Sequence, residues 1–203
     1  MVSILVIVLY VFSAISAYAQ KSLLQKYRFE DGGYTLAGIF VHHKDHPLQK
    51  KIGEFYTDDI AVLNAIKKSW VFTKPQYQHA CGYHYNFLIL KDGVEIDSFA
   101  LNLECNELVT DDGSVFFDHG KLAMFASKLK PLRRNECEFA SIAEARAFLT
   151  KIKKEPNFVY AWPPRWLTFE GEFRFGTKCP KDLGNNCSYM EHEGELVSTL
   201  RFP

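Results

Sequence analysis

The sequence lacks the composition and the short motifs that identify most nucleic-acid-binding proteins and many enzymes. Its 24 lysines and arginines balance 24 aspartates and glutamates over 203 residues, so net charge provides no long-range attraction for a polyanion. It contains no Gly-x-Ser-x-Gly, no glycine-rich phosphate-binding loop and no Cys-x-x-Cys pair. We therefore expect no nucleic-acid partner and no cofactor.

Long apolar runs are absent after the first 19 residues, but one lies within them. Nine consecutive apolar residues, Ile4 to Phe12, precede the small residues of Ala17-Tyr18-Ala19, which is the layout of a secretory signal peptide. No lysine or arginine precedes the run, and an uncleaved anchor is the alternative. We predict that residues 1–19 are a signal peptide, that the mature chain begins at Gln20, and that it is secreted or periplasmic with no membrane span after cleavage.

Five cysteines are consistent with an oxidising compartment, where disulfides persist. Cys81 and Cys105 stand at the open end of a predicted hairpin that turns at residues 91–93. Period-two alternation places both on the aromatic face of the hairpin, and we predict a bridge between them. A second bridge would join Cys179 and Cys187 across a turn-rich loop. Cys137 is left over and is interpreted as a buried thiol.

The pattern of apolar residues predicts an α+β fold, with a mostly antiparallel sheet or sheets and about three helices packed on one face. Hairpins are expected at residues 27–41 and 81–105, and helices are expected to begin near Thr57 or Asp58, at Asp118, and at the capping box that opens with Ser141. Residues 20–203 are predicted to form a single α+β domain, with a possible seam near residues 131–133 between two β-α-β halves.

The densest group of possible metal ligands is the segment containing His42, His43 and His46. On a helix, His42 and His46 would share a face and could bind zinc. Pro47 favours a loop with solvated histidines instead, so the metal site is the lesser hypothesis. Alternation places His84 on a solvent-exposed face, where it would be structurally neutral, and spacing alone does not place His119 near any other histidine.

An aromatic platform is the other candidate site. Trp162, Arg165 and Trp166 flank two prolines, and such residues are enriched where proteins bind partners. The alternative is that both indoles close one edge of the core.

Taken together, these features predict a non-enzymatic extracytoplasmic protein that binds a protein or an envelope component, as an inhibitor or immunity factor would. The alternative hypothesis is a secreted metal-dependent or hydrolytic enzyme with a histidine-based site, assembled only by folding.

Overall fold

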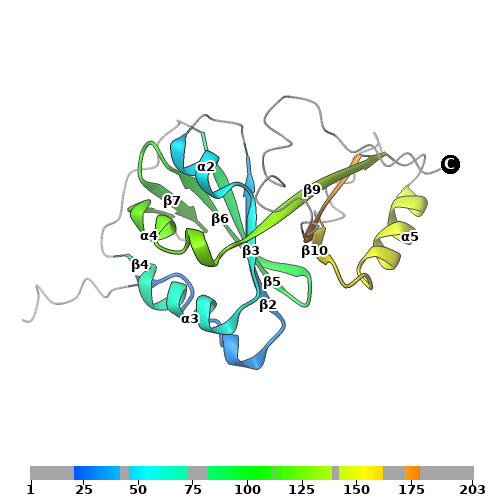
Figure 1. Cartoon of the computed structure of the whole chain (residues 1–203), viewed down its shortest axis with the longest axis horizontal. Helices are drawn as coiled ribbons and strands as arrows, with labels where there is room; N and C mark the ends of the chain where they lie inside the picture. The colour runs from blue at the N-terminus through cyan, green and yellow to red at the C-terminus, as the bar shows by residue number, and fades with distance from the viewer. Residues whose placement is uncertain are drawn as a thin grey trace, which may run out of the picture.

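The computed structural model describes residues 21–41, 46–72, 82–111, 113–138, 142–161 and 172–178. Within these ranges the dominant element is a nine-stranded sheet with the strand order β10-β11-β9-β3-β2-β5-β6-β7-β8. Every neighbouring pair in it is antiparallel. Helices α2, α3 and α4 lie along one side of this sheet and contribute to the same core, and α5 lies beyond β10 (Figure 1). The predicted α+β class is confirmed.

The elements have the following bounds. The strands of the large sheet are β2 (Tyr34–Phe40), β3 (Phe55–Thr57), β5 (Tyr85–Lys91), β6 (Val94–Asn102), β7 (Glu107–Thr110), β8 (Gly113–Phe116), β9 (Lys130–Glu138), β10 (Phe158–Ala161) and β11 (Glu172–Lys178). A separate pair joins β1 (Lys21–Ser22) to β4 (Val71–Phe72). The helices are α2 (Pro47–Ile52), α3 (Ile60–Ser69), α4 (Gly120–Ala123) and α5 (Ile142–Ile152), with 3-10 turns η1 (Phe29–Asp31) and η2 (Ala126–Lys128).

The hairpin of β5 and β6 lies between β2 and β7 in the sheet, and its predicted turn and aromatic face are confirmed. The chain reverses at Asp92 and Gly93, both with positive φ, as expected of an Asp-Gly turn. Tyr85 pairs with Leu101 and Phe87 pairs with Phe99, so the predicted aromatic face is continuous across the two strands. A register shift after Ile89 marks a bulge.

Both faces of the sheet are covered. The larger core joins Leu36, Phe87 and Leu101 of the sheet to Leu63 and Ile66 of α3, and it also includes residues of α2 and α4. Trp70 stacks on Phe87 with ring centroids 5.1 Å apart. The second face carries a smaller core. Strands that are buried on both faces explain the continuous apolar run at residues 87–90.

The second core forms because the sheet curls until β10 reaches the β5–β6 turn. Val159 and Tyr160 of β10 belong to the same cluster as Leu88 and Leu90 of β5. The approach is close, since a Cβ built on Gly93 would lie 2.9 Å from a ring carbon of Phe158. Glycine is therefore needed at this position for space as well as for its φ of 75°.

Two predicted elements differ in the structure. The hairpin expected at residues 27–41 is wrong, because β2 already pairs with β3 on one side and β5 on the other. Its expected first strand forms the 3-10 turn η1 instead and buries Phe29 completely. The helix expected after Asp118 is a single turn, α4, followed by η2, although Asp118 does accept a hydrogen bond from the Gly120 backbone N–H at 2.8 Å.

The helix predicted to begin near Thr57 or Asp58 is present as α3. Asp59, one residue after the expected Asp58, caps α3 by accepting hydrogen bonds from two backbone N–H groups. Strand β9 runs through residues 131–133, where the possible seam was predicted. In the described ranges we find no helix that combines the length and the apolar character needed to cross a membrane.

Candidate functional site

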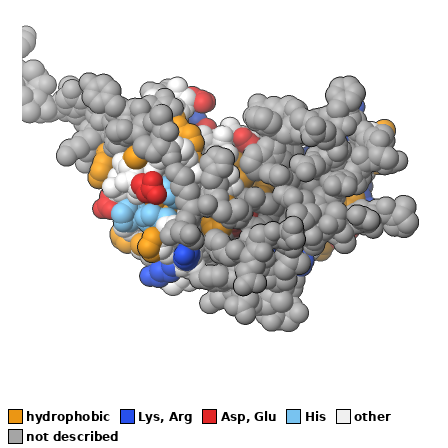
Figure 2. All heavy atoms as spheres, turned by 90° about the horizontal axis from the view of Figure 1, so that it is seen from above, with side chains coloured by type: hydrophobic (Ala, Val, Ile, Leu, Met, Phe, Trp, Pro, Cys, Tyr) orange, Lys and Arg blue, Asp and Glu red, His pale blue; other side chains and the backbone are white. Residues whose placement is uncertain are grey.

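Several polar side chains converge at one end of the sheet, opposite the β5–β6 turn. Here β2 ends, β5 begins at Tyr85, and β6 passes into β7 through the turn at residues 103–106. Helices α2 and α4 lie beside this end (Figure 1), and each brings a histidine at its N-terminus. Histidine side chains gather there on the surface, next to an acidic side chain (Figure 2).

His84 forms the buried floor of this cluster. It is fully buried, at a bend just before β5, and its Nδ1 accepts a hydrogen bond from the Leu103 backbone N–H at 3.1 Å. Its carbonyl oxygen accepts hydrogen bonds from the Val41 backbone N–H and from Gln49 Nε2. The prediction that His84 is exposed and structurally neutral is wrong, because strand alternation does not extend into the bend.

His46 stands between the other two histidines. Its ring centroid lies 5.5 Å from that of His84 and 5.7 Å from that of His119. As the N-cap of α2, it has extended backbone angles and accepts a hydrogen bond from the Leu48 backbone N–H at Nδ1, as the influence of Pro47 on the preceding residue predicts. Burial, and then the neighbouring His119, lower the pKa of His46 below its ordinary value of 6.5, while Glu104 raises it.

His119 is the N-cap residue of α4. Its Nδ1 lies 2.8 Å from Oδ1 of Asn106. An amide oxygen only accepts hydrogen bonds, so Nδ1 of His119 carries the proton and Nε2 holds a lone pair in the neutral ring. His46 and His84 have the opposite tautomer. In each ring Nδ1 accepts a hydrogen bond from a backbone N–H, so the proton of the neutral ring is on Nε2.

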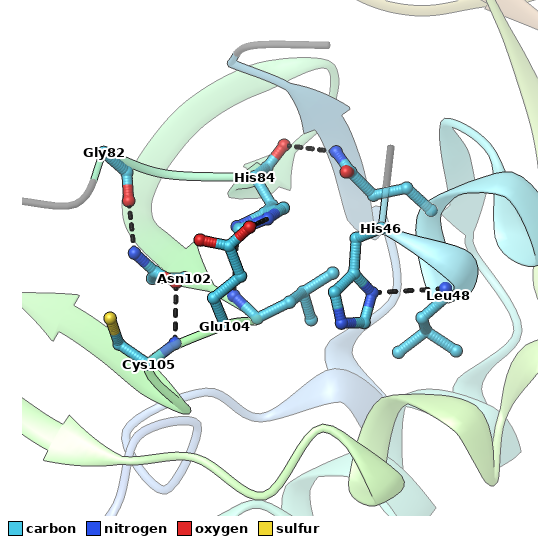
Figure 3. A network of polar contacts seen from close by, with 9 residues as sticks. His46, Leu48, Gly82, His84, Asn102, Glu104 and Cys105 are labelled. Atoms are coloured by element: carbon cyan, nitrogen blue, oxygen red, sulfur yellow. Dashed lines mark hydrogen bonds and ion pairs between the residues drawn. The ribbon is translucent and has the colours of Figure 1, made fainter. Parts of the chain in front are cut away.

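The β6–β7 turn supplies the carboxylate of the cluster. Buried Asn102 holds the turn, since its Nδ2 donates to the Gly82 carbonyl and its Oδ1 accepts from the Cys105 backbone N–H at 2.9 Å. Glu104 Oε1 lies 3.9 Å from Nε2 of His84. Figure 3 shows the Glu104 side chain over the His84 ring, with the His46 ring across from them and the Cys105 sulfur directed away.

This hydrogen-bonding pattern has a consequence for metal binding. A histidine ligand needs a lone pair on the coordinating nitrogen, and its other nitrogen normally donates a hydrogen bond. In His46 and His84 the lone pair is at Nδ1 and is already used by a backbone N–H. Among the residues with described positions, no group of three or more His, Cys, Asp or Glu side chains is arranged to hold a metal ion. With these hydrogen bonds in place, the neutral rings of His46 and His84 present N–H donors at Nε2, and His119 presents a lone pair at Nε2.

The structure describes only some of the residues predicted to form sites. Of the predicted metal ligands, His46 lies in the cluster, whereas His42 and His43 fall outside the described residues. The Trp162, Arg165 and Trp166 platform also lies outside them. Three of the four cysteines predicted to form disulfides, Cys81, Cys179 and Cys187, also lie outside the described residues.

Cys105 does not lie on a strand, although the predicted alternation of side chains along the hairpin includes it. Strand β6 ends at Asn102, and Cys105 is in the following turn. The period-two argument for its orientation therefore stops three residues before it. A bridge to Cys81 stays a prediction.

Sequence reasoning missed His84, Glu104, Asn106 and His119 as members of one site. The available signals were local: Asn106 is in a short turn between two strands, and His119 precedes a glycine at the start of a helix. Neither signal reports that the segments meet. In comparisons with known proteins, no family model, curated protein or solved structure matches the chain.

Proposed function

We propose that this protein is a hydrolase that uses the histidine cluster to cleave a carboxylic ester, with His119 as the general base and neutral His46 as the hydrogen-bond donor to the carbonyl oxygen. The observation that supports this is the pair of hydrogen bonds at Nδ1 of His119 and of His46, which assign complementary tautomers to the two rings. Two rings 5.7 Å apart present one lone pair and one N–H, which is what water attack on a carbonyl requires.

His119 has the properties of a base. The hydrogen bond between its Nδ1 and Asn106 leaves Nε2 to accept a proton from water. The ring is only partly buried, so both water and substrate can reach it. Imidazole is the side chain that most often serves as a general base in enzymes.

His46 has the properties of an electrophile. Its lowered pKa keeps the ring neutral near pH 7, and protonation at Nδ1 would require it to lose the bond from the Leu48 N–H. The Nε2–H group can then donate to an oxygen that becomes negatively charged in the transition state. A neutral imidazole in this role is known where a helix N-terminus lowers its pKa.

The proposed reaction balances with these two groups and water. His119 Nε2 removes a proton from water as the oxygen attacks the carbonyl carbon, and the carbonyl oxygen accepts a hydrogen bond from His46. When the tetrahedral intermediate breaks down, the His119 imidazolium gives its proton to the leaving alkoxide. The products are a carboxylic acid and an alcohol, and an ester is favoured because an alkoxide leaves more readily than an amide nitrogen.

A panel of chromogenic esters of graded acyl length tests this proposal with the purified chain. We expect hydrolysis above the buffer rate, and a loss of about 10²–10⁴-fold in kcat for His119→Gln. Glu155→Gln, which changes an exposed side chain near the end of α5, is the matched control and should keep full activity. Equal rates in the wild type and His119→Gln would contradict the proposal.

Binding to a protein or an envelope component is a second candidate function. Strand β8 is an edge of the described sheet, and Phe116 on it is 44% exposed. An extended segment of a partner could add to this edge. Loss of captured partner in Phe116→Asp, with unchanged ester hydrolysis, would favour this function over the first.

Secretion, the signal peptide and the disulfides belong to the same proposal. We infer that the site acts outside the cytoplasm, after removal of residues 1–19. Mass spectrometry of the exported chain should find Gln20 at its N-terminus, and peptide maps under non-reducing conditions should link Cys81 to Cys105 and Cys179 to Cys187. A chain that begins at Met1 and has reduced thiols would contradict this.

A further inference from the structure

Asn106 is held at the site by its backbone as well as by its side chain. Its φ is 50°, and it is one of two non-glycine residues with positive φ in the described ranges. Its carbonyl oxygen accepts a hydrogen bond from the Phe117 backbone N–H at 2.7 Å. Its side-chain oxygen lies 2.8 Å from Nδ1 of His119, which is two residues after Phe117. Two hydrogen bonds from one residue therefore fix the segment that carries the base.

The turn alone does not explain asparagine at this position. Glycine adopts φ near +50° with no steric cost, and asparagine is tolerated there better than most residues. A glycine would preserve the turn and the backbone bond to Phe117. What asparagine adds is the acceptor for His119 Nδ1.

We propose that Asn106 is a positioning residue that selects the Nδ1–H tautomer of His119 and so keeps Nε2 available as the base. This inference rests on the proposed function for its catalytic consequence. The amide oxygen accepts from Nδ1–H in the neutral ring and also in the imidazolium, since both forms carry a proton on that nitrogen. The contact therefore persists while His119 gains and returns a proton, and the ring does not have to turn between the two steps.

Two substitutions separate this role from a structural one. Asn106→Gly keeps a residue suited to positive φ and removes the acceptor. Asn106→Asp keeps the acceptor and adds a negative charge, which stabilises an imidazolium. The readouts are the ring-nitrogen NMR shifts of His119, which report its tautomer without any substrate, and the pH profile of ester hydrolysis.

We expect Asn106→Gly to move the neutral His119 ring toward the Nε2–H tautomer and to lower kcat about tenfold, as loss of one hydrogen bond does. In Asn106→Asp the Nδ1–H tautomer should remain, and the acid limb of kcat/KM should move to higher pH by about one unit. Thermal unfolding of Asn106→Gly should match the wild type closely enough to exclude misfolding as the cause.

The outcomes are distinguishable from those of the proposed function. If Asn106→Gly retains the Nδ1–H tautomer of His119, the inference is overturned, whatever the activity. If the wild type hydrolyses no ester but the tautomer changes as expected, the proposed function fails and the assignment of Asn106 to the His119 tautomer stands. A lowered kcat in Asn106→Asp with no displacement of the pH profile would also overturn the inference.

Discussion

The two ends of the β5–β6 hairpin depend on contacts of different range. At the turn, Asp92 and Gly93 lie next to each other in the sequence and their positive φ angles close the hairpin. At the open end, His46, His84 and His119 come from segments separated by more than thirty residues and meet only in the folded sheet. Local sequence therefore decides the conformation of the turn, on which β10 then packs, whereas the whole fold brings the residues of the open end together. Substitutions can therefore remove the packing that both ends share, or change one end alone.

Removing the packing that both ends share should have the largest effect. Phe87 is fully buried between them and contacts Trp70, Phe55 and Tyr85. Phe87→Ala should lower the free energy of unfolding by about 3–5 kcal/mol. Urea denaturation measures this, and the exposed ring of Phe116 provides a control, since Phe116→Ala should change stability by no more than about 0.5 kcal/mol. A comparable effect for the two variants would mean that the β5–β6 face is not the core.

The open end should depend on the buried ring of His84. In His84→Ala the Leu103 N–H loses its acceptor inside the protein, and the ring leaves a cavity. We expect a loss of about 2–3 kcal/mol in the free energy of unfolding. His119→Ala is the matched comparison, because its ring is partly exposed and its loss should cost less than that of His84. If His84→Ala were neutral, His84 would not be the floor of the cluster.

The stability of the turn end should depend on the absence of a side chain at Gly93. Gly93→Ala introduces a side chain at a φ of 75° and 2.9 Å from the Phe158 ring. We expect a loss of about 2 kcal/mol in the free energy of unfolding, of which the backbone alone accounts for about 1 kcal/mol. The same substitution in a Phe158→Ala background isolates the backbone part, because the ring that the new methyl group would meet is then absent. Equal costs of Gly93→Ala in the two backgrounds would remove the evidence that β10 packs on this turn.

The same contrast in range explains what the sequence could and could not predict. The β5–β6 turn, its register and the helix at residues 60–69 follow from Asp-Gly, period-two alternation and an aspartate cap, which are all local signals. A strand is predicted at residues 27–30, because Tyr27 and Phe29 alternate with charged residues just before Asp31-Gly32-Gly33. The place beside β2 that this strand would take is occupied by β3, which follows β2 in the chain by about twenty residues. No local pattern indicates that pairing.

The candidate site was harder to predict for the same reason. His46 could be recognised as a possible functional residue from its neighbours in the sequence. Whether His84 is buried depends on the point at which β5 begins. Whether His119 lies near His46 depends on where α4 packs relative to α2. No pattern within either segment contains that information.

The smallest expected effect concerns pH and applies to the open end alone. Because the folded protein holds the pKa of His46 below 6.5, the unfolded chain binds a proton there first as the pH falls. Stability from this group is complete above pH 6.5 and declines below it until the folded-state pKa is passed. His46→Asn keeps an N-cap side chain for α2 and removes this titration, so its free energy of unfolding should vary less between pH 5 and 7, by chemical denaturation at each pH. An unchanged pH dependence in His46→Asn would show that protonation of His46 is not linked to folding, and the neutral electrophile assigned to this ring would lose its basis.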